Sequence, residues 1–318
     1  MGGGSWTRDV YDRVTRSKID SGTTFAYTTT SKSRGVYEAH DGLKILDEQG
    51  RPVTRESRDS DEHPETTPIV IGFDVTGSMG HNPEILQREL KGLFGMLVRK
   101  DVVSDPQIAI GAYGDTWCDK VPVQFSQFES DNRIDDNLDN VFIEGCGGGN
   151  NGETSTALVW FVANHVVTDA WEKRGKRGYL FLVGDECALK VRADHAKTHL
   201  GESRDITPQE AFSAVREKWD TYFLLVDNHA AYWQNSKAKY EELLGKDHVI
   251  KLESTESAPA VIASLIGMAE GTVDDKSIVE DLVDAGFSTQ VAIETRSTVG
   301  INTVKGDVAM EVYGDLGL

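Results

Sequence analysis

Short apolar runs with little polar interruption mark the middle of this sequence. They occur at residues 69–73, 107–113, 179–183, 221–226 and 249–252. Runs of this length are typical of parallel strands that are covered on both faces of a sheet. We therefore predict five buried strands in this part of the chain.

The segments between these runs carry apolar residues at helical spacing. The first is introduced by Asn82, Pro83 and Glu84, a cap and first turn typical of a helix. The predicted helices cover residues 82–97, 131–142, 154–171, 208–217, 232–244 and 259–269, and a weaker strand covers 121–125. Strands that alternate with helices predict an α/β fold, a doubly wound and mostly parallel sheet with helices on both faces.

The segment before the first buried strand lacks a lasting period. Strand-like pieces at 24–29 and 43–46 precede a turn at 49–52, and the polar segment 57–67 is typical of a linker. We interpret residues 1–66 as an extended N-terminal arm and linker that becomes ordered on a partner.

The segment after the last predicted helix is acidic. Residues 270–318 carry a net charge of −7, with a small helix expected at 277–285 and strands at 290–293 and 308–312. The predicted domains are therefore the arm, a core domain at 67–269, and this acidic C-terminal extension.

Composition narrows the classes of function. The net charge is −19 with scattered basic residues, so the basic patch expected of a nucleic-acid-binding protein is missing. No apolar stretch has the roughly 20 residues of a membrane span, and the first residues lack the apolar core of a secretory signal. Three cysteines without a CxxC pair do not form a disulfide framework. We expect a cytoplasmic protein with no nucleic-acid or membrane partner.

Oxygen-bearing side chains gather where the predicted strands end. Asp74, Thr76 and Ser78 follow the first strand, Thr154 begins a helix after a glycine-rich loop, and Asp185 follows a third strand. Ligands bind at this carboxyl edge in open α/β sheets. The donors are hard oxygens, which Mg²⁺ prefers. Because hydroxyl ligands are uncharged, a Mg²⁺ held mainly by Ser78, Thr76 and Thr154 would need one more anionic ligand.

The segment 67–269 resembles a von Willebrand factor A (VWA) domain with a metal-ion-dependent adhesion site (MIDAS). The family motif Asp-x-Ser-x-Ser is similar to Asp74-Val75-Thr76-Gly77-Ser78, and the threonine and aspartate of the second and third loops match Thr154 and Asp185. The resemblance implies that the hydroxyls contact Mg²⁺, or Mn²⁺ or Ca²⁺, while the aspartates orient water and hydroxyls. It also implies that an acidic residue of a protein partner completes the site.

Two positions depart from the family pattern. Thr76 replaces a serine but keeps the oxygen, whereas Gly184-Asp185-Glu186 replaces the common Thr-Asp-Gly. Glu186 is therefore a candidate to fill the open metal position from within the chain.

Other interpretations compete for the same residues. The first motif could cap the following helix, and Asp115 could support a ligand or be a solvated turn residue. The glycine-rich loop 145–153 could bind phosphate, although it lacks the lysine of a P-loop. His195 and His199, four residues apart with Cys187 nearby, could bind zinc.

The enzyme alternative is a haloacid-dehalogenase-like, Mg²⁺-dependent phosphohydrolase. In that case Asp74 would be the nucleophile, and Lys190 is a candidate for the lysine that this chemistry needs. This hypothesis leaves Thr154 unexplained.

We favour a non-catalytic, Mg²⁺-dependent protein-interaction module, a component or adaptor of a larger assembly. By family analogy alone, that assembly could contain an AAA+ ATPase or serve stress or defence. A structural part of a multimeric or viral assembly is a further alternative, and the sequence does not define the oligomeric state.

Overall fold

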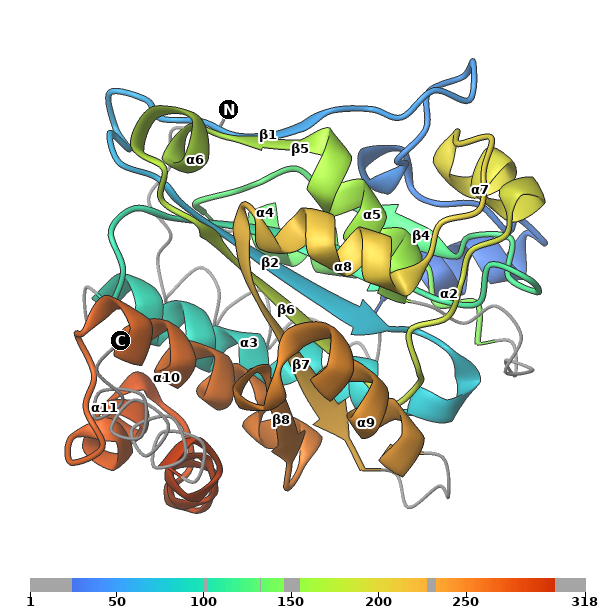
Figure 1. Ribbon diagram of the computed structural model, residues 1–318. Coiled ribbons are helices and arrows are strands. Elements are labelled where there is room, and N and C mark those ends of the chain that lie inside the picture. Colours follow the sequence, from blue (N-terminus) through green and yellow to red (C-terminus); the bar gives the residue numbers. More distant parts are fainter. Residues whose placement is uncertain (1–24, 100–101, 132, 146–154, 228–232, 301–318) are drawn as a thin grey trace, which may run out of the picture.

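A central sheet of six strands organises the computed structural model, which describes residues 25–99, 102–131, 133–145, 155–227 and 233–300 (Figure 1). The strand order is β4-β3-β2-β6-β7-β8. The strands are β2 (Thr67–Asp74), β3 (Pro106–Tyr113), β4 (Val123–Phe125), β6 (Gly178–Gly184), β7 (Trp219–Val226) and β8 (Val249–Leu252). All neighbours pair in parallel except β3 and β4, which are antiparallel. The predicted mostly parallel α/β sheet is confirmed.

Helices cover both faces of this sheet (Figure 1). One face packs against α3 (Asn82–Arg99), α4 (Arg133–Asp139), α10 (Ala258–Glu270) and α11 (Ile278–Ala285). The other packs against α5 (Ser155–His165), α7 (Ala193–Leu200), α8 (Pro208–Arg216) and α9 (Trp233–Leu244). Each central strand therefore presents apolar residues on both faces, which explains the continuous apolar runs in the sequence.

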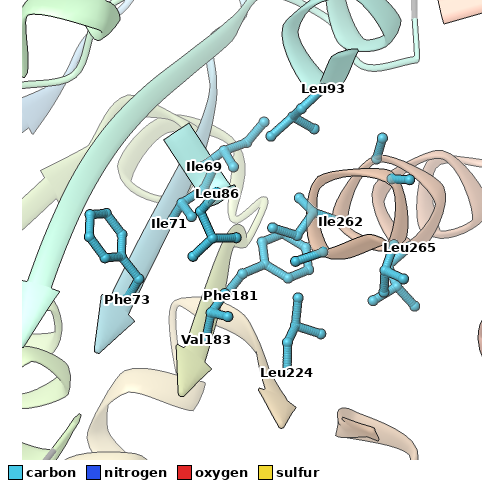
Figure 2. Packing of buried hydrophobic residues seen from close by; sticks show 14 of the residues in the cluster. Ile69, Ile71, Phe73, Leu86, Leu93, Phe181, Val183, Leu224, Ile262 and Leu265 are labelled. Atoms are coloured by element: carbon cyan, nitrogen blue, oxygen red, sulfur yellow. The ribbon is translucent and has the colours of Figure 1, made fainter. Parts of the chain in front are cut away.

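Strand β2 shows how alternating side chains serve the two layers. Ile69 and Ile71 lie on the side of Leu86, Leu93 and Ile262 in Figure 2, and Phe73 belongs to the same buried cluster. On the other face, Gly72 leaves room for Leu158 of α5, because a Cβ at Gly72 would lie 2.5 Å from the Leu158 Cδ2 atom. Close helix contact at this glycine fixes α5 over the centre of the sheet.

The predicted helix at 154–171 is wrong in its continuity. Helix α5 ends at His165, the strand β5 (Val166–Thr168) follows, and α6 (Asp169–Arg174) begins after it. Strand β5 pairs in parallel with β1 (Arg55–Ser57). Two β-branched valines and a threonine favour this extended conformation. The pairing partner lies over 100 residues away, so helical periodicity could not reveal it.

Other local predictions in the flanking segments are also wrong. The expected strand at 24–29 is largely helix α2 (Ala26–Ser33), and the expected strand at 43–46 is replaced by a 3-10 turn, Asp41–Leu43, and one isolated bridge. The expected strand at 290–293 lies within a helix over residues 289–300, and the segment 308–312 lies outside the described residues. The expected helix at 131–142 shortens to α4. Short apolar runs are ambiguous between strand and helix, and tertiary packing decides between them.

The remaining short elements are 3-10 turns. Two of the local predictions are confirmed. The turns cover Gly77–Met79, Lys246–His248 and Thr255–Ser257. The turn predicted at 49–52 is confirmed, with Gly50 in a left-handed conformation and its N–H bonded to the Asp47 carbonyl. The helix predicted at 277–285 is confirmed as α11. Within the described ranges, no helix has the length and apolar character to cross a membrane.

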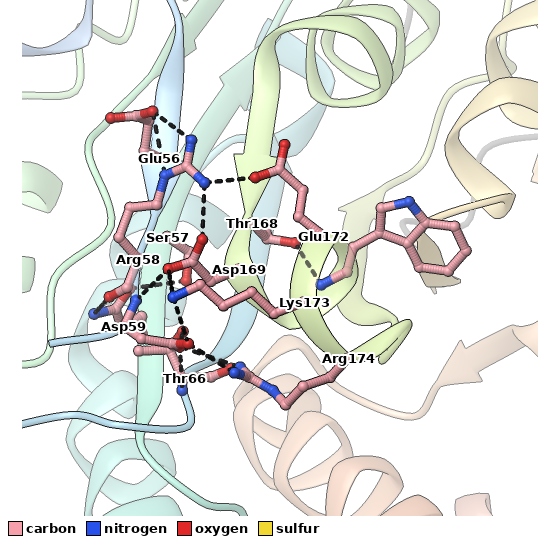
Figure 3. Close-up of polar contacts among 12 residues, drawn as sticks. Glu56, Ser57, Arg58, Asp59, Thr66, Thr168, Asp169, Glu172, Lys173 and Arg174 are labelled. Carbon is pink, nitrogen blue, oxygen red and sulfur yellow. Dashed lines mark hydrogen bonds and ion pairs between the residues drawn. The ribbon is translucent and has the colours of Figure 1, made fainter.

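The polar segment interpreted as a linker is bound to the domain by ion pairs (Figure 3). Arg58 contacts Asp169 at 2.8 Å and Glu172 at 2.6 Å. Asp59 contacts Arg174 at 2.7 Å and accepts a hydrogen bond from the Thr66 hydroxyl at 2.9 Å. These contacts join the segment before β2 to α6, so this part of the predicted linker is held against the core. The boundaries at 66 and 269 stay predictions.

Asp59 gives this network a defined pH dependence. The Arg174 guanidinium, followed by the hydrogen bonds from Thr66, holds the pKa of Asp59 well below its usual range despite the opposing effect of burial. A carboxyl whose pKa is lowered by folding stabilises the folded state above its unfolded pKa. That stabilisation is lost as pH falls toward the lower, folded-state pKa.

We predict that Asp59→Asn lowers the free energy of unfolding by about 1.5–3 kcal/mol at pH 7, the range for hydrogen bonds to charged groups. The deficit should shrink as pH falls below about 4, because the wild-type carboxyl then binds a proton in the unfolded state before it does so in the folded state. Urea unfolding at several pH values measures it. The control is Asp41→Asn, which alters an exposed pair with Lys44 and should leave stability unchanged. An equal loss at all pH values would contradict the prediction.

Candidate metal centre

Strand β2 delivers Asp74 into the interior at the carboxyl edge of the sheet. The residue is 1% exposed, and its Oδ1 atom accepts two hydrogen bonds from Thr76, one from the backbone N–H at 2.8 Å and one from the hydroxyl at 2.7 Å. Thr76 precedes the turn Gly77–Met79 but makes no side-chain cap bond to it. The helix-cap interpretation of this motif therefore does not describe what the threonine hydroxyl does.

Ser78 joins the first loop to the third. Its hydroxyl donates to Asp185 Oδ1 at 3.0 Å, and its oxygen lies 3.0 Å from that of Thr76. Four of the five predicted site residues thus form one chain of contacts, Asp74 to Thr76 to Ser78 to Asp185. The fifth, Thr154, lies outside the described residues. The first residue of α5, Ser155, is buried with its hydroxyl 2.7 Å from that of Tyr240.

The donor set at this cluster fits a cation. The Thr76 and Ser78 hydroxyls contact Asp74 and Asp185, and their own oxygens lie 3.0 Å apart. Hydroxyl and carboxylate oxygens are the ligands that Mg²⁺ prefers. The residues present fit the metal that the sequence predicts.

The electrostatics of Asp74 and Asp185 also favour a bound cation. Burial raises the pKa of Asp74 well above its ordinary value, and the nearby charges of Asp185 and Glu186 raise it further. The hydrogen bonds from Thr76 oppose this rise. Asp185 is itself completely buried. Without a cation, these charges favour a proton on Asp74, and a bound cation would stabilise the ionised pair instead.

Tyr113, which the sequence analysis did not single out, shapes the site together with Gly184. Tyr113, at the end of β3, is buried and donates its hydroxyl to the Val183 carbonyl at 3.0 Å. A Cβ at Gly184 would overlap this hydroxyl and lie 3.1 Å from the Asp74 Cβ. The sequence carries no separate signal for Tyr113, because its pairing with Asp74 is visible only in the strand register of the structure.

The competing chemistries find less support in the geometry. Lys190 pairs with Asp205 at 2.7 Å on the surface, and Asp74 is enclosed rather than presented to a substrate. His195 and His199 lie on α7, but no three histidine, cysteine or acidic side chains converge as a metal site anywhere among the described residues. The phosphate hypothesis for loop 145–153 falls almost wholly outside those residues.

An exposed aromatic group lies on the loop that follows β3. Trp117 is 52% exposed, with the Arg192 guanidinium 5.0 Å from its ring centre and the His195 ring edge-on at 5.2 Å. Arg192 and His195 lie at the start of α7, on the segment that follows Asp185 and β6. The loops after β3 and β6 therefore contact each other at the surface through these three side chains.

Comparison with known proteins gives distant structural likenesses. No family model and no curated protein sequence matches the chain. The pilus adhesin SpaC from Lactobacillus rhamnosus GG is similar at a TM-score of 0.48 and 10% identity, covering 68% of this chain and 32% of the adhesin. Proximal thread matrix protein 1 from the mussel byssus, with a zinc-occupied MIDAS motif, is similar at a TM-score of 0.42 and 12% identity, covering 64% of this chain and 46% of that protein. BatB from Bacteroides thetaiotaomicron is similar at a TM-score of 0.41 and 11% identity, covering 64% of this chain and 98% of BatB.

The fold assignment depends on the topology of this chain. A mostly parallel sheet carries helices on both faces, and the Asp-x-Thr-x-Ser loop sits at the carboxyl end of the central strand β2. The chain therefore has the doubly wound, mostly parallel α/β fold that its sequence predicted.

We predict that, in EDTA, Asp74→Asn is more stable than the wild type at neutral pH. The asparagine Oδ1 can keep both hydrogen bonds from Thr76 while the charge opposing Asp185 disappears. Because folding raises the pKa of Asp74, the contribution of this carboxyl to stability falls as pH rises above about 4, and the variant lacks this loss. Thermal unfolding at pH 4 and pH 7 measures the difference. Asp194→Asn, an exposed charge change, is the control. A variant less stable than the wild type at pH 7 would contradict this account.

Proposed function

We propose that this protein is a non-catalytic protein-interaction module whose contact depends on a divalent cation, with Mg²⁺ as the resident ion. The observation that supports it most directly is the hydroxyl pair Thr76 and Ser78. Each of these hydroxyls donates its proton to a buried aspartate while the two oxygens lie 3.0 Å apart. This arrangement suits a cation between oxygens better than it suits a nucleophile.

In this proposal Thr76 and Ser78 are donors to the ion, with Thr154 as the donor from the second loop, while Asp74 and Asp185 orient these hydroxyls and the water around the ion. Neutral hydroxyl ligands leave much of the positive charge of the ion uncompensated, so an anionic group from outside the cluster would be attracted strongly. The proposed external ligand is an aspartate or glutamate of a protein partner. Glu186 competes for this position from within the chain.

The surface around the cluster suits such a partner. Trp117 and Arg192 offer an exposed aromatic ring and a guanidinium, two groups that are enriched where proteins bind each other. A guanidinium can also pair with a second carboxylate of an acidic segment. We propose that the partner contacts this pair together with the metal.

The cellular compartment of this contact, and the assembly that it serves, are also proposals. Cys118 and Cys187 form no disulfide within the described residues, which is compatible with a reducing, cytoplasmic compartment. An adaptor role beside a larger machine, such as an AAA+ ATPase in stress or defence, follows from analogy alone. The same metal-dependent contact would serve a multimeric structural assembly.

We predict that the wild type binds Mn²⁺ and Mg²⁺ in isothermal titration and that Ser78→Ala weakens binding at least about tenfold. The variant removes one oxygen donor and one contact with Asp185 while keeping the charge of the protein. Ser33→Ala, a hydroxyl deletion on exposed α2, is the matched control and should bind normally. Absence of metal binding by the wild type would refute the proposed function.

The partner contact needs a separate measurement. Once a partner is identified by affinity capture, its binding should be lost in EDTA and restored by Mg²⁺. Binding that survives both EDTA and Ser78→Ala would show that the metal site does not carry the interface.

A further inference from the structure

Asp115 is a buried carboxylate that lies outside the proposed set of metal ligands. It is 1% exposed and lies two residues beyond the end of β3. Its Oδ1 atom accepts a hydrogen bond from the Trp117 backbone N–H at 2.7 Å. Its Oδ2 atom is buried and has no hydrogen-bond partner in the described part of the chain. Buried polar atoms are nearly always paired, and an unpaired carboxylate oxygen is costly.

The immediate neighbours of Asp115 make this cost larger. The Asp115 backbone N–H donates to Asp119 Oδ2 at 2.8 Å, which brings the two acidic residues together in one tight turn. Burial raises the pKa of Asp119 to about 6, and the negative charges of Glu144 and Asp115 add to the rise. The surroundings of Asp115 are therefore acidic, and no compensating charge comes from this turn.

Basic side chains near the turn are engaged elsewhere. The Lys120 ammonium lies over the Tyr37 ring, 4.8 Å from its centre, and the Arg192 guanidinium lies over Trp117. The sequence contains no lysine or arginine between Arg133 and Lys173, a stretch that includes the loop before α5. These two cations therefore lie over aromatic rings in the described part of the chain, and a bound ion would supply a charge that balances Asp115.

The strand register places Asp115 at the edge where that ion is proposed. Tyr113 pairs with Asp74, and the Val75 N–H donates to the Tyr113 carbonyl at 2.9 Å. Side chains alternate along a strand, and both Gly72 and Gly111 face Leu158 of α5. By this alternation Asp74 and Tyr113 also lie on the α5 side, at the end where α5 begins, and Asp115 follows directly.

We infer that Asp115 is a further anionic group of the metal site, supplied by a fourth loop of the sheet edge. No three acidic, histidine or cysteine side chains converge tightly within the described residues, so Asp115 is assigned as a positioning residue. It acts on the ion through its charge and by accepting hydrogen bonds from the water around it. This inference depends on the proposed function, because it requires that the cluster at Asp74 and Ser78 binds a cation.

Asp115→Asn tests this role in the full-length protein. Asparagine keeps the Oδ1 acceptor for Trp117, so the turn is retained while the buried charge is removed. We expect Mn²⁺ affinity in isothermal titration to fall about 10- to 100-fold, the usual range for groups that support metal ligands. In EDTA, the melting temperature should stay equal to or above that of the wild type. The rise in melting temperature on adding Mn²⁺ should be smaller for the variant.

Two controls separate this inference from the proposed function. Asp194→Asn removes an exposed charge near the same loops and should bind Mn²⁺ as the wild type does. Ser78→Ala reports on the main cluster. The inference predicts that Asp115→Asn weakens Mn²⁺ binding about tenfold or more. If Ser78→Ala weakens binding but Asp115→Asn binds Mn²⁺ within about twofold of the wild type, the inference is wrong and the proposed function stands. A loss of stability by Asp115→Asn in EDTA would assign Asp115 a purely structural role. A wild type that binds no Mn²⁺ overturns both.

Discussion

Two carboxylates, Asp74 and Asp185, lie almost completely buried at one edge of a parallel sheet, and the surrounding structure is arranged around that constraint. Neighbouring parallel strands β2 and β6 end together, so the residues that follow them meet. Thr76 and Ser78 fill the space between the two acids, and the absence of a side chain at Gly184 leaves room for Asp74 and the Tyr113 hydroxyl. The site depends on the register of these strands more than on any single residue.

The central sheet was predictable because its apolar runs are local signals. A strand such as β6 is buried along its whole length, and its carboxyl end is marked by Gly184 and Asp185. The same logic predicts that Asp74, Thr76, Ser78 and Asp185 gather at this edge of the sheet. Their contact in the structure agrees with that expectation, while the metal itself stays a proposal.

The missed features depend on partners distant in sequence. Residues 166–168 belong to a strand only because β1 lies beside them, and the polar residues Arg58 and Asp59 are ordered because α6 presents opposite charges. Tyr113 was hidden by its ordinary position at the end of an apolar strand. Periodicity describes how one segment buries its own side chains, and it carries no information about which remote segment will pair with it.

The strand pair β1 and β5 has a mechanical consequence. Strand β5 is continuous with the carboxyl end of α5, and α5 begins directly after Thr154. The hydrogen bonds of this pair therefore tie the segment before the central sheet to the carboxyl end of α5, so a displacement of β1 relative to the sheet would load the end of that helix.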